Sequence, residues 1–324
     1  MRHNYGFMIS SMKRTLGVLM DPISSINTSK DSTFAMLLEA QARNWQILYF
    51  EQSDLSLRDN QVIANCAELH VRDNSSDGFS LQHKAIRPLA SMDAILMRKD
   101  PPFNMQYIYS TYLLELSGSL VINHPQALRD YNEKLATAWF PQCCAPFMVG
   151  ADMQGLKDFI DQQKDVIVKP LDGMGGASIF RTSENDPNRN VILEILTEHG
   201  SNPIMAQRYI PEISDGDKRI LIVNGEAIPY ALARIPQGKE HRGNLAAGGT
   251  GTGVELSKRD LWICQQLGPE LKKRGILFAG IDVIGDYLTE INITSPTCIR
   301  ELDKIYGLNI SARLFDAIEE NLSE

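Results

Sequence analysis

Three oxygen-bearing side chains lie close together near the C-terminal end, in a segment that reads as two apolar strands joined at Gly285-Asp286. Glu290 and Asn292 are two residues apart and therefore project from the same face of one strand, while Asp282 lies on the other strand. Hard oxygen ligands gathered in this way suit Mg²⁺, which fills its remaining positions with water and phosphates. A single acidic residue on a hairpin is more often merely solvated, but Asn292 is a poor strand former that gains nothing from exposure there. The pattern therefore favours a magnesium site.

The register of this hairpin decides whether the three side chains can share an ion. A two-residue turn would place Asp282 opposite Thr289, which would send Asp282 and Glu290 to opposite faces. A connection one residue longer, or a bulge, would place Asp282 opposite Glu290. We therefore predict an odd-length connection through Gly285, Asp286 and Tyr287.

A glycine-rich loop is the second candidate for chemistry. Gly173, Gly175 and Gly176 separate an apolar strand, which ends at Lys169, from a second strand that begins near Ser178. Backbone N–H groups approach phosphate oxygens closely where Cβ atoms are absent. The loop lacks the Gly-Lys-Ser/Thr ending of a P-loop and leads into a strand, so we expect a flap over phosphates whose charge Lys169 offsets. An isolated glycine loop is more often a plain hairpin turn, and only its neighbours favour the functional interpretation.

Composition restricts the partners that the chain can have. Its 324 residues, 43% of them hydrophobic, are ordinary for a globular protein of more than one domain. A net charge of -8 argues against nucleic acid and against an anionic membrane surface. The sequence has no apolar run of the roughly 20 residues that a membrane span needs, and residues 1–14 lack the apolar core of a signal peptide. The five cysteines show no disulfide or metal spacing. We expect a cytoplasmic protein with reduced thiols.

The elements that position these residues fall into an α/β part and an α+β part. After an extension at residues 1–12, strands and helices alternate over 13–131, which predicts an open, Rossmann-like parallel sheet. The first strand is followed by Asp21-Pro22-Ile23 rather than by a glycine-rich pyrophosphate turn, which disfavours a nicotinamide dehydrogenase. From about Asn132 the pattern changes to two α+β lobes, which we place at 132–208 and 209–324.

Several long motifs carry a resemblance to a known family. They are Met20-Asp-Pro-Ile23, Met97-Arg-Lys-Asp-Pro-Pro-Phe103, Asn132-Glu-Lys-Leu135, the segment from Lys169 to Ser178, Asp215-Gly-Asp-Lys-Arg219, the segment from Arg242 to Gly249 and the segment from Thr289 to Glu301. Together they resemble the ATP-grasp superfamily and, within it, bacterial glutathione synthetases, from about Thr15 to the C-terminus. The resemblance implies a Rossmann-like domain followed by a two-lobed ATP-grasp fold.

The resemblance also implies roles for particular residues. The ATP phosphates would meet Lys134 and Lys169 under the loop of Gly173, Met174, Gly175, Gly176, Ala177 and Ser178. The rest of the nucleotide site would comprise Gln207, Tyr209, Ile210 and Asp217, and Mg²⁺, with Mn²⁺ as an alternative, would bind Asp282, Glu290 and Asn292. The peptide substrate and its phosphorylated carboxylate would meet Arg98, Arg219, Arg234 and Arg242, under a mobile lid at 236–253.

The chemistry that the resemblance implies explains why these residue types occur together. A carboxylate does not react with an amine at neutral pH, so the γ-phosphoryl group of ATP first converts it to an acyl phosphate. Magnesium, lysines and arginines offset the repulsion between phosphates and carboxylate. The resemblance implies the substrates ATP, γ-glutamylcysteine and glycine and a homo-oligomer, a tetramer by family precedent. One alternative is another ATP-grasp ligase with a different acid or amine, because the identity of the substrates rests on the resemblance alone. A second is an ATP-binding regulatory protein such as the synapsins, against which Arg219 and Arg234 argue, although strand-end arginines are often merely solvated.

Overall fold

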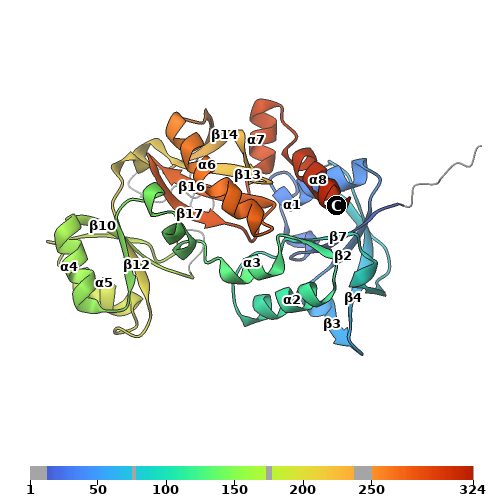
Figure 1. Cartoon of the computed structure of the whole chain (residues 1–324), viewed down its shortest axis with the longest axis horizontal. Helices are drawn as coiled ribbons and strands as arrows, with labels where there is room; N and C mark the ends of the chain where they lie inside the picture. The colour runs from blue at the N-terminus through green and yellow to red at the C-terminus, as the bar shows by residue number, and fades with distance from the viewer. Residues whose placement is uncertain (1–12, 75–77, 173–176, 237–249, 324) are drawn as a thin grey trace, which may run out of the picture.

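The computed structural model describes residues 13–74, 78–172, 177–236 and 250–323, and these form three sheets (Figure 1). Gly173, Met174, Gly175, Gly176, Arg242 and most of the expected lid lie outside the described residues. No helix within the described ranges is long and apolar enough to cross a membrane.

The first sheet has a parallel centre. In spatial order its strands are β3 (Leu55–Arg58), β4 (Gln61–Val71), β2 (Gln46–Phe50), β1 (Thr15–Leu19), β7 (Ala94–Met97) and β8 (Leu120–Ile122). The pairs of β1 with β2 and β7, and of β7 with β8, are parallel. Leu16 to Leu19 and Ala94 to Met97 are buried along their whole length, as expected of parallel strands covered on both faces.

The other half of this unit adds antiparallel strands to the expected parallel ones. The long strand β4 pairs antiparallel with β2, β3, β5 (Phe79–Leu81) and β6 (Ala85–Pro88). Residues 61–71 alternate between buried and more exposed positions, which is typical of an antiparallel strand with one solvated face. The sheet is therefore mixed, with its parallel strands at β2, β1, β7 and β8.

The second and third sheets are wholly antiparallel. The second has the order β11 (Phe180–Ser183), β10 (Asp165–Pro170), β12 (Ile204–Arg208), β9 (Phe147–Gly150), and carries α4 (Met153–Gln163) and α5 (Arg189–Leu196). The third has the order β15 (Thr250–Glu255), β14 (Glu226–Ile235), β13 (Asp217–Val223), β16 (Phe278–Ile284), β17 (Tyr287–Asn292), and carries α6 (Lys258–Lys273).

The remaining helices are α1 (Ser32–Ala42), α2 (Met105–Leu116), α3 (Pro125–Asp130), α7 (Ile299–Tyr306) and α8 (Ile310–Asn321). Of these, α7 and α8 contact both α1 and strands of the third sheet, whereas α2 packs on β3 and β4 of the first. The C-terminal helix α8 lies beside α1 (Figure 1), where Phe315 meets the ring of Trp45 edge-on at 5.6 Å. Asn123, just after β8, donates to the carbonyls of Phe278 and Ile293 at 2.7 Å each. These contacts fix the carboxyl edge of the first sheet against strands β16 and β17.

Candidate active site

The β16–β17 hairpin brings Asp282 and Glu290 opposite each other, but by a different device from the one that we predicted. Ile284 pairs with Tyr287 across a two-residue Gly285-Asp286 turn, so the prediction of an odd-length connection is wrong. The register then shifts between Val283 and Asp282, so that Asp282 pairs with Glu290 and Gly280 with Asn292. The extra residue of this bulge is Thr289, whose hydroxyl donates to the Asp282 carbonyl at 3.1 Å. The bulge thus supplies the shift that the turn does not.

Asp282 is the centre of a buried ion-pair network. Arg219, opposite it on β13, donates from Nε to Oδ1 at 2.5 Å and from the guanidinium Nη2 to Oδ2 at 3.0 Å. Arg234 on β14 lies 2.9 Å from Asp282 Oδ2 and donates to Asp217 Oδ2 at 2.5 Å. All four side chains are buried. Burial opposes ionisation of Asp282, but the two guanidinium groups outweigh it and hold the pKa of its carboxyl well below the ordinary value.

Asp217 also binds Arg234, but its pKa is shifted in the opposite direction from that of Asp282. Burial raises the pKa of Asp217 to about 7, because the attraction of Arg234 does not offset the loss of water. Its Oδ1 atom is buried and has no hydrogen-bond partner among the described residues. A buried oxygen without a partner is expected to accept a hydrogen bond from a bound water or ligand. A ligand at this site can therefore supply the hydrogen bond that Asp217 Oδ1 lacks.

The two lysines of the site are buried in different ways. Lys134 bonds the Glu133 carboxylate and lies 3.7 Å from Glu290 Oε1, so it already has carboxylate partners. Lys169 Nζ contacts Gln207 Oε1 at 3.4 Å and the Thr289 carbonyl at 3.5 Å, and no described carboxylate is within ion-pair distance. Burial lowers the pKa of Lys169, whereas Glu290 and Glu133 outweigh burial and raise the pKa of Lys134. Lys169 is thus a desolvated cation that has no ion-pair partner among the described residues.

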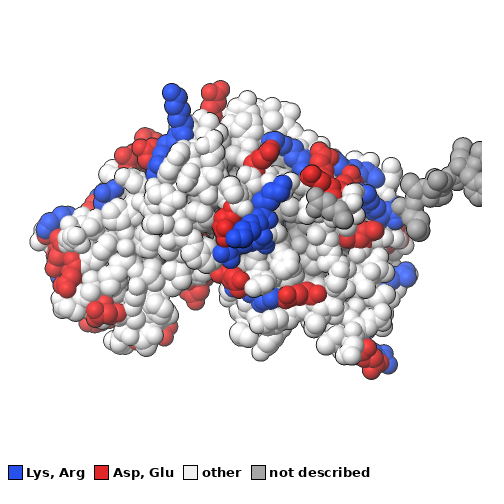
Figure 2. Space-filling view, viewed as in Figure 1, with Lys and Arg blue, Asp and Glu red and all other residues white. Residues whose placement is uncertain are grey.

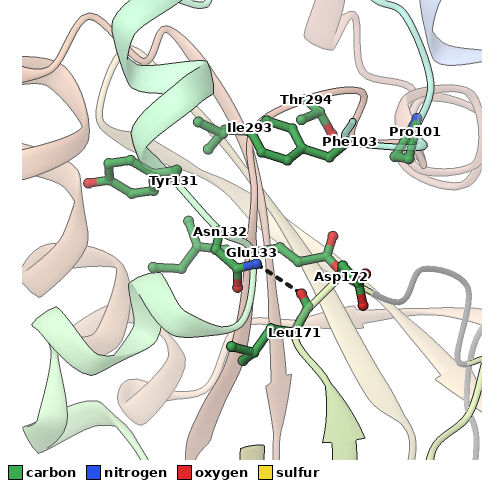
Figure 3. A pocket seen from close by; sticks show the side chains of 10 residues that line it. Pro101, Phe103, Tyr131, Asn132, Glu133, Leu171, Asp172, Ile293 and Thr294 are labelled. Carbon is green, nitrogen blue, oxygen red and sulfur yellow. Dashed lines mark hydrogen bonds between the residues drawn. The ribbon is translucent and has the colours of Figure 1, made fainter. Parts of the chain in front are cut away.

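A short polar segment before the 3-10 helix Leu135–Trp139 holds Lys134 in place. Asn132 Oδ1 accepts from the backbone N–H of Lys134 at 3.1 Å, and its amide donates to the Leu171 carbonyl at 2.9 Å (Figure 3). The Glu133 carbonyl accepts from Ile291 N–H at 2.8 Å. This segment therefore joins the second sheet to the third beside the hairpin.

The pocket in Figure 3 lies at this junction. Its lining residues come from all three sheets or their loops: Pro101, Phe103, Tyr131, Asn132, Glu133, Leu171, Asp172, Ile291, Ile293 and Thr294. The side chain of Glu133 lines this pocket. Burial, and to a smaller extent the nearby charge of Glu290, raises the pKa of the Glu133 carboxyl to about 7. Sequence reasoning gave Glu133 no role. Its position between Asn132 and Lys134 in one motif was the available signal.

Arg98 lies at the carboxyl end of β7, one loop away from the ion-pair network. Its Nε donates to Thr33 Oγ1 at 3.0 Å and its Nη2 donates to the Pro296 carbonyl at 2.9 Å. No carboxylate of the described residues makes an ion pair with it, and burial lowers the pKa of its guanidinium. Pro296 also packs near Arg219, because a Cβ built on Gly280 would lie 2.9 Å from an atom of each. Arg98 is thus a second buried cation beside the network with no ion-pair partner in the described part of the chain.

The remaining expected site residues lie around the second sheet. Gln207 on β12 is buried and touches Lys169. Ile210 is buried, while Tyr209 lies under the Arg181 guanidinium at 3.7 Å. Ala177 and Ser178 precede β11, which begins at Phe180 rather than near Ser178.

Asp282, Glu290 and Asn292 suit a hard divalent cation. Cross-strand pairing brings the two carboxylates and the side-chain amide of Asn292 together. The Asn292 amide nitrogen lies 3.4 Å from Asp282 Oδ2. Within the described ranges, no three His, Cys, Asp or Glu side chains form a complete metal cage. Mg²⁺ rarely uses such a cage and takes few protein carboxylates together with phosphates and water. The donor set therefore fits an ion that arrives with a phosphate ligand.

Comparisons with known proteins agree over almost the whole chain. Residues 14–129 match the model of the prokaryotic glutathione synthetase N-terminal domain, and residues 133–307 match the prokaryotic glutathione synthetase ATP-grasp domain. The chain is 55% identical to a glutathione synthetase of Pseudomonas aeruginosa over 96% of this chain and 99% of that protein. It is 53% identical to a glutathione synthetase of Escherichia coli O157:H7 over 95% of this chain and 99% of that protein.

Solved structures of more distant proteins share the fold. The D-cycloserine synthetase DcsG has a TM-score of 0.66 at 13% identity, covering 95% of this chain and 99% of that one. The ATP-grasp ligase PsnB, complexed with a precursor peptide, has a TM-score of 0.60 at 15% identity, covering 95% and 98%. At this identity the likeness concerns the arrangement of the three sheets.

Proposed function

Because the chain belongs to the prokaryotic glutathione synthetase family, we propose that it joins γ-glutamylcysteine to glycine, with cleavage of ATP to ADP and phosphate. The reaction proceeds through an acyl phosphate of the cysteinyl carboxylate, which the glycine amine then attacks. Units 13–131, 132–208 and 209–324 each carry one of the three sheets and together enclose the site. The need for ATP places the reaction in the cytoplasm.

The observation that carries this proposal is the presence of two buried cations to which residues 13–74, 78–172, 177–236 and 250–323 supply no ion-pair partner. Lys169 lies beside Gln207 in the second sheet, and Arg98 lies at the edge of the first sheet. A buried cation gains most from an ionised, hydrogen-bonded partner that water no longer screens. We assign Lys169 to a phosphate of ATP and Arg98 to a carboxylate of the peptide substrate.

Lys134, Arg219 and Arg234 then stabilise charge as the phosphoryl group moves. Asp282, Glu290 and Asn292 would hold Mg²⁺, which would neutralise part of the negative charge of the phosphates. A bound phosphate would give Arg219 and Arg234 new acceptors, which would leave Asp282 available as one of the residues that hold the ion. The arginines already lie in fixed positions on β13 and β14, which reduces the reorganisation needed in the transition state.

Phosphate release tests the proposal. Purified protein with ATP and Mg²⁺ should release phosphate rapidly only when γ-glutamylcysteine and glycine are both present. Release with one substrate alone, or with neither, would refute the assigned reaction. Replacing Mg²⁺ by Mn²⁺ in the same assay tests the choice of ion, and replacing γ-glutamylcysteine by other short acids tests the choice of substrate.

Arg98→Lys separates the two assigned anions. Lysine keeps the charge but lacks the planar fork of arginine. We expect a KM for γ-glutamylcysteine raised at least tenfold and a KM for ATP changed by less than about threefold, because one lost bidentate bond is worth about 1.5–3 kcal/mol. An equal rise in both values would contradict the assignment of Arg98 to the peptide.

A further inference from the structure

A basic hollow lies between the end of α6 and the short helix α3, and no residue that lines it is assigned to the proposed reaction. Its volume is about 460 Å³, within the range of small-molecule sites. Lys272, Lys273 and Arg274 line this α3–α6 hollow from the end of α6, and His124 and Asp130 line it from the two ends of α3. Figure 2 shows Lys and Arg side chains gathered near the centre of this face, where α6 approaches α3 in Figure 1. Cations therefore outnumber carboxylates in the hollow, although the whole chain has a net charge of -8.

The packing of the chain leaves these cations largely unused. Lys272 and Lys273 are exposed, and neither has an ion-pair partner in the described part of the chain. Arg274 donates through Nε to Glu270 Oε1 at 2.6 Å. That bond fixes the guanidinium and leaves its two Nη groups able to donate to another acceptor.

The lysines are also not needed to cap α6. Basic side chains are common in the last turn of a helix because they bind its free carbonyl groups. Here backbone N–H groups do so: Gly275 donates to the Lys272 carbonyl at 3.0 Å, and Ile276 donates to the Leu271 carbonyl at 3.0 Å. The ammonium groups of the two lysines are therefore available to a ligand.

His124 closes the hollow on the side of α3. Its backbone N–H donates to the Gly275 carbonyl at 3.1 Å, and a Cβ built on Gly275, where φ is +70°, would lie 2.9 Å from His124 Cβ. Glycine thus permits both the turn and the close approach of the two elements. His124 Nδ1 accepts from the Gln126 backbone N–H at 3.3 Å, which places the proton of the neutral ring on Nε2. This N–H adds a further donor to the cations.

We propose that the α3–α6 hollow binds a small anion with two linked phosphate groups. Ammonium groups bind phosphate as point charges, and the planar fork of Arg274 binds two oxygens of one phosphate. A water molecule occupies about 30 Å³, so the hollow has room for roughly 15 waters and accommodates more than one phosphate group. The net charge of -8 repels a long polyanion such as nucleic acid, whereas the local excess of cations attracts a short one.

Calorimetry with inorganic pyrophosphate tests the site. The wild type should bind pyrophosphate, and Lys272→Gln with Lys273→Gln should weaken this binding at least about tenfold, because two charge-assisted contacts are lost. The matched control is Lys258→Gln with Lys304→Gln, two exposed lysines outside the hollow, which should bind as the wild type does. Binding at the nucleotide site is common to all three proteins, so the differences between them measure the hollow. An unchanged affinity of the first variant, an equal loss in the control, or no binding by the wild type would overturn the proposal.

Citrate tests the chemical class of the ligand, because it carries a similar charge on carboxylates. It should bind more weakly than pyrophosphate at the same ionic strength. Citrate that binds as tightly as pyrophosphate, with the same loss in Lys272→Gln with Lys273→Gln, would refute the assignment to phosphate.

Tryptophan emission tests where the anion binds. Trp139 is 47% exposed, and the Arg274 guanidinium lies 4.7 Å from its ring centroid. Pyrophosphate that binds Arg274 should change the emission of the wild type, and Trp139→Phe should abolish this change while the heat of binding remains. A change that persists in Trp139→Phe would place the anion near Trp45 or Trp262 and refute the site.

Discussion

Lys134 and Lys169 have the same proposed task, yet the structure predicts that replacement by methionine destabilises the protein at Lys134 and changes its stability little at Lys169. Methionine keeps much of the side-chain volume and removes the charge. Lys134 lies between Glu133 and Glu290, so its loss leaves two nearby carboxylates without their shared cation. Lys169 has two long hydrogen bonds and no described carboxylate at ion-pair distance, so its loss removes a desolvated charge.

The magnitudes follow from these surroundings. Removing one member of a buried ion pair costs about 3–5 kcal/mol. The Glu133 and Glu290 side chains keep 25% and 20% of their surface exposed, so we reduce this to about 2 kcal/mol for Lys134→Met. For Lys169→Met, two weak bonds are lost at 3.4 and 3.5 Å and the cost of burying a cation is relieved. The free energy of unfolding should stay within about 1 kcal/mol of wild type.

Both variants should lose about 10²–10³-fold in kcat, the usual effect of removing one charged group from a transition state. Urea unfolding without ligands gives the stabilities, and phosphate release gives the rates. Equal destabilisation by the two substitutions would refute the difference that we infer between the lysines. A kcat for Lys169→Met within a few fold of wild type would refute its role at the phosphate.

The pH dependence of the Lys169 variant gives a separate check. The pKa of Lys169 is lowered from its ordinary value of 10.5, so between the folded-state pKa and 10.5 the unfolded chain binds more protons than the native chain. Stability of the wild type therefore rises with pH through that window. Lys169→Met lacks this titration and should show a smaller rise in urea midpoint toward pH 10.5. Identical slopes for the two proteins would contradict the desolvated lysine.

Three further substitutions test the packing of the site. Asp282→Asn leaves Arg219 buried without a carboxylate and should lower the free energy of unfolding by about 3–5 kcal/mol, and an unchanged urea midpoint would show that the ion pair has little weight. Tyr107→Phe removes a buried hydroxyl that has no described partner and should raise the free energy of unfolding by about 1 kcal/mol, so a lower melting temperature would reveal a missing partner. Gly280→Ala places a Cβ 2.9 Å from Arg219 Cδ and should lower kcat/KM about 10²-fold with the fold intact, whereas a wild-type rate would mean that Arg219 moves without consequence.

The hairpin shows how far the sequence could lead. Apolar residues on either side of Gly285-Asp286 predicted two paired strands, and the spacing of Glu290 and Asn292 predicted one shared face. Because a shared metal ion requires Asp282 and Glu290 on one face, we predicted that the register set by a two-residue turn does not continue along the whole hairpin. The place of the correction could not be read from the sequence, because a turn and a bulge shift the register by the same one residue. The structure places it at Thr289, whose hydroxyl bonds the Asp282 carbonyl.

The partners of the charged residues could not be predicted for a similar reason. The resemblance grouped Arg219, Arg234 and Asp282 into one site but assigned the arginines to substrate and the aspartate to metal. In the structure these groups bind one another. Such pairing depends on which side chains face each other across β13, β14 and β16, and pairing between strands distant in sequence leaves no local pattern.

The ion pairs of the chain without ligands also suggest an order in which the site responds to its substrates. Arg219, Arg234 and Lys134 are already neutralised by carboxylates, so an incoming anion must compete with Asp282 or Glu290 for them. Lys169 and Arg98 have no such competitor among the described residues. An anion therefore gains more by meeting these two cations first, and carboxylates that the arginines release would then be available to hold a divalent cation. On this reasoning we propose that the internal ion pairs preserve the site geometry before binding and make full engagement of the arginines depend on nucleotide and metal together.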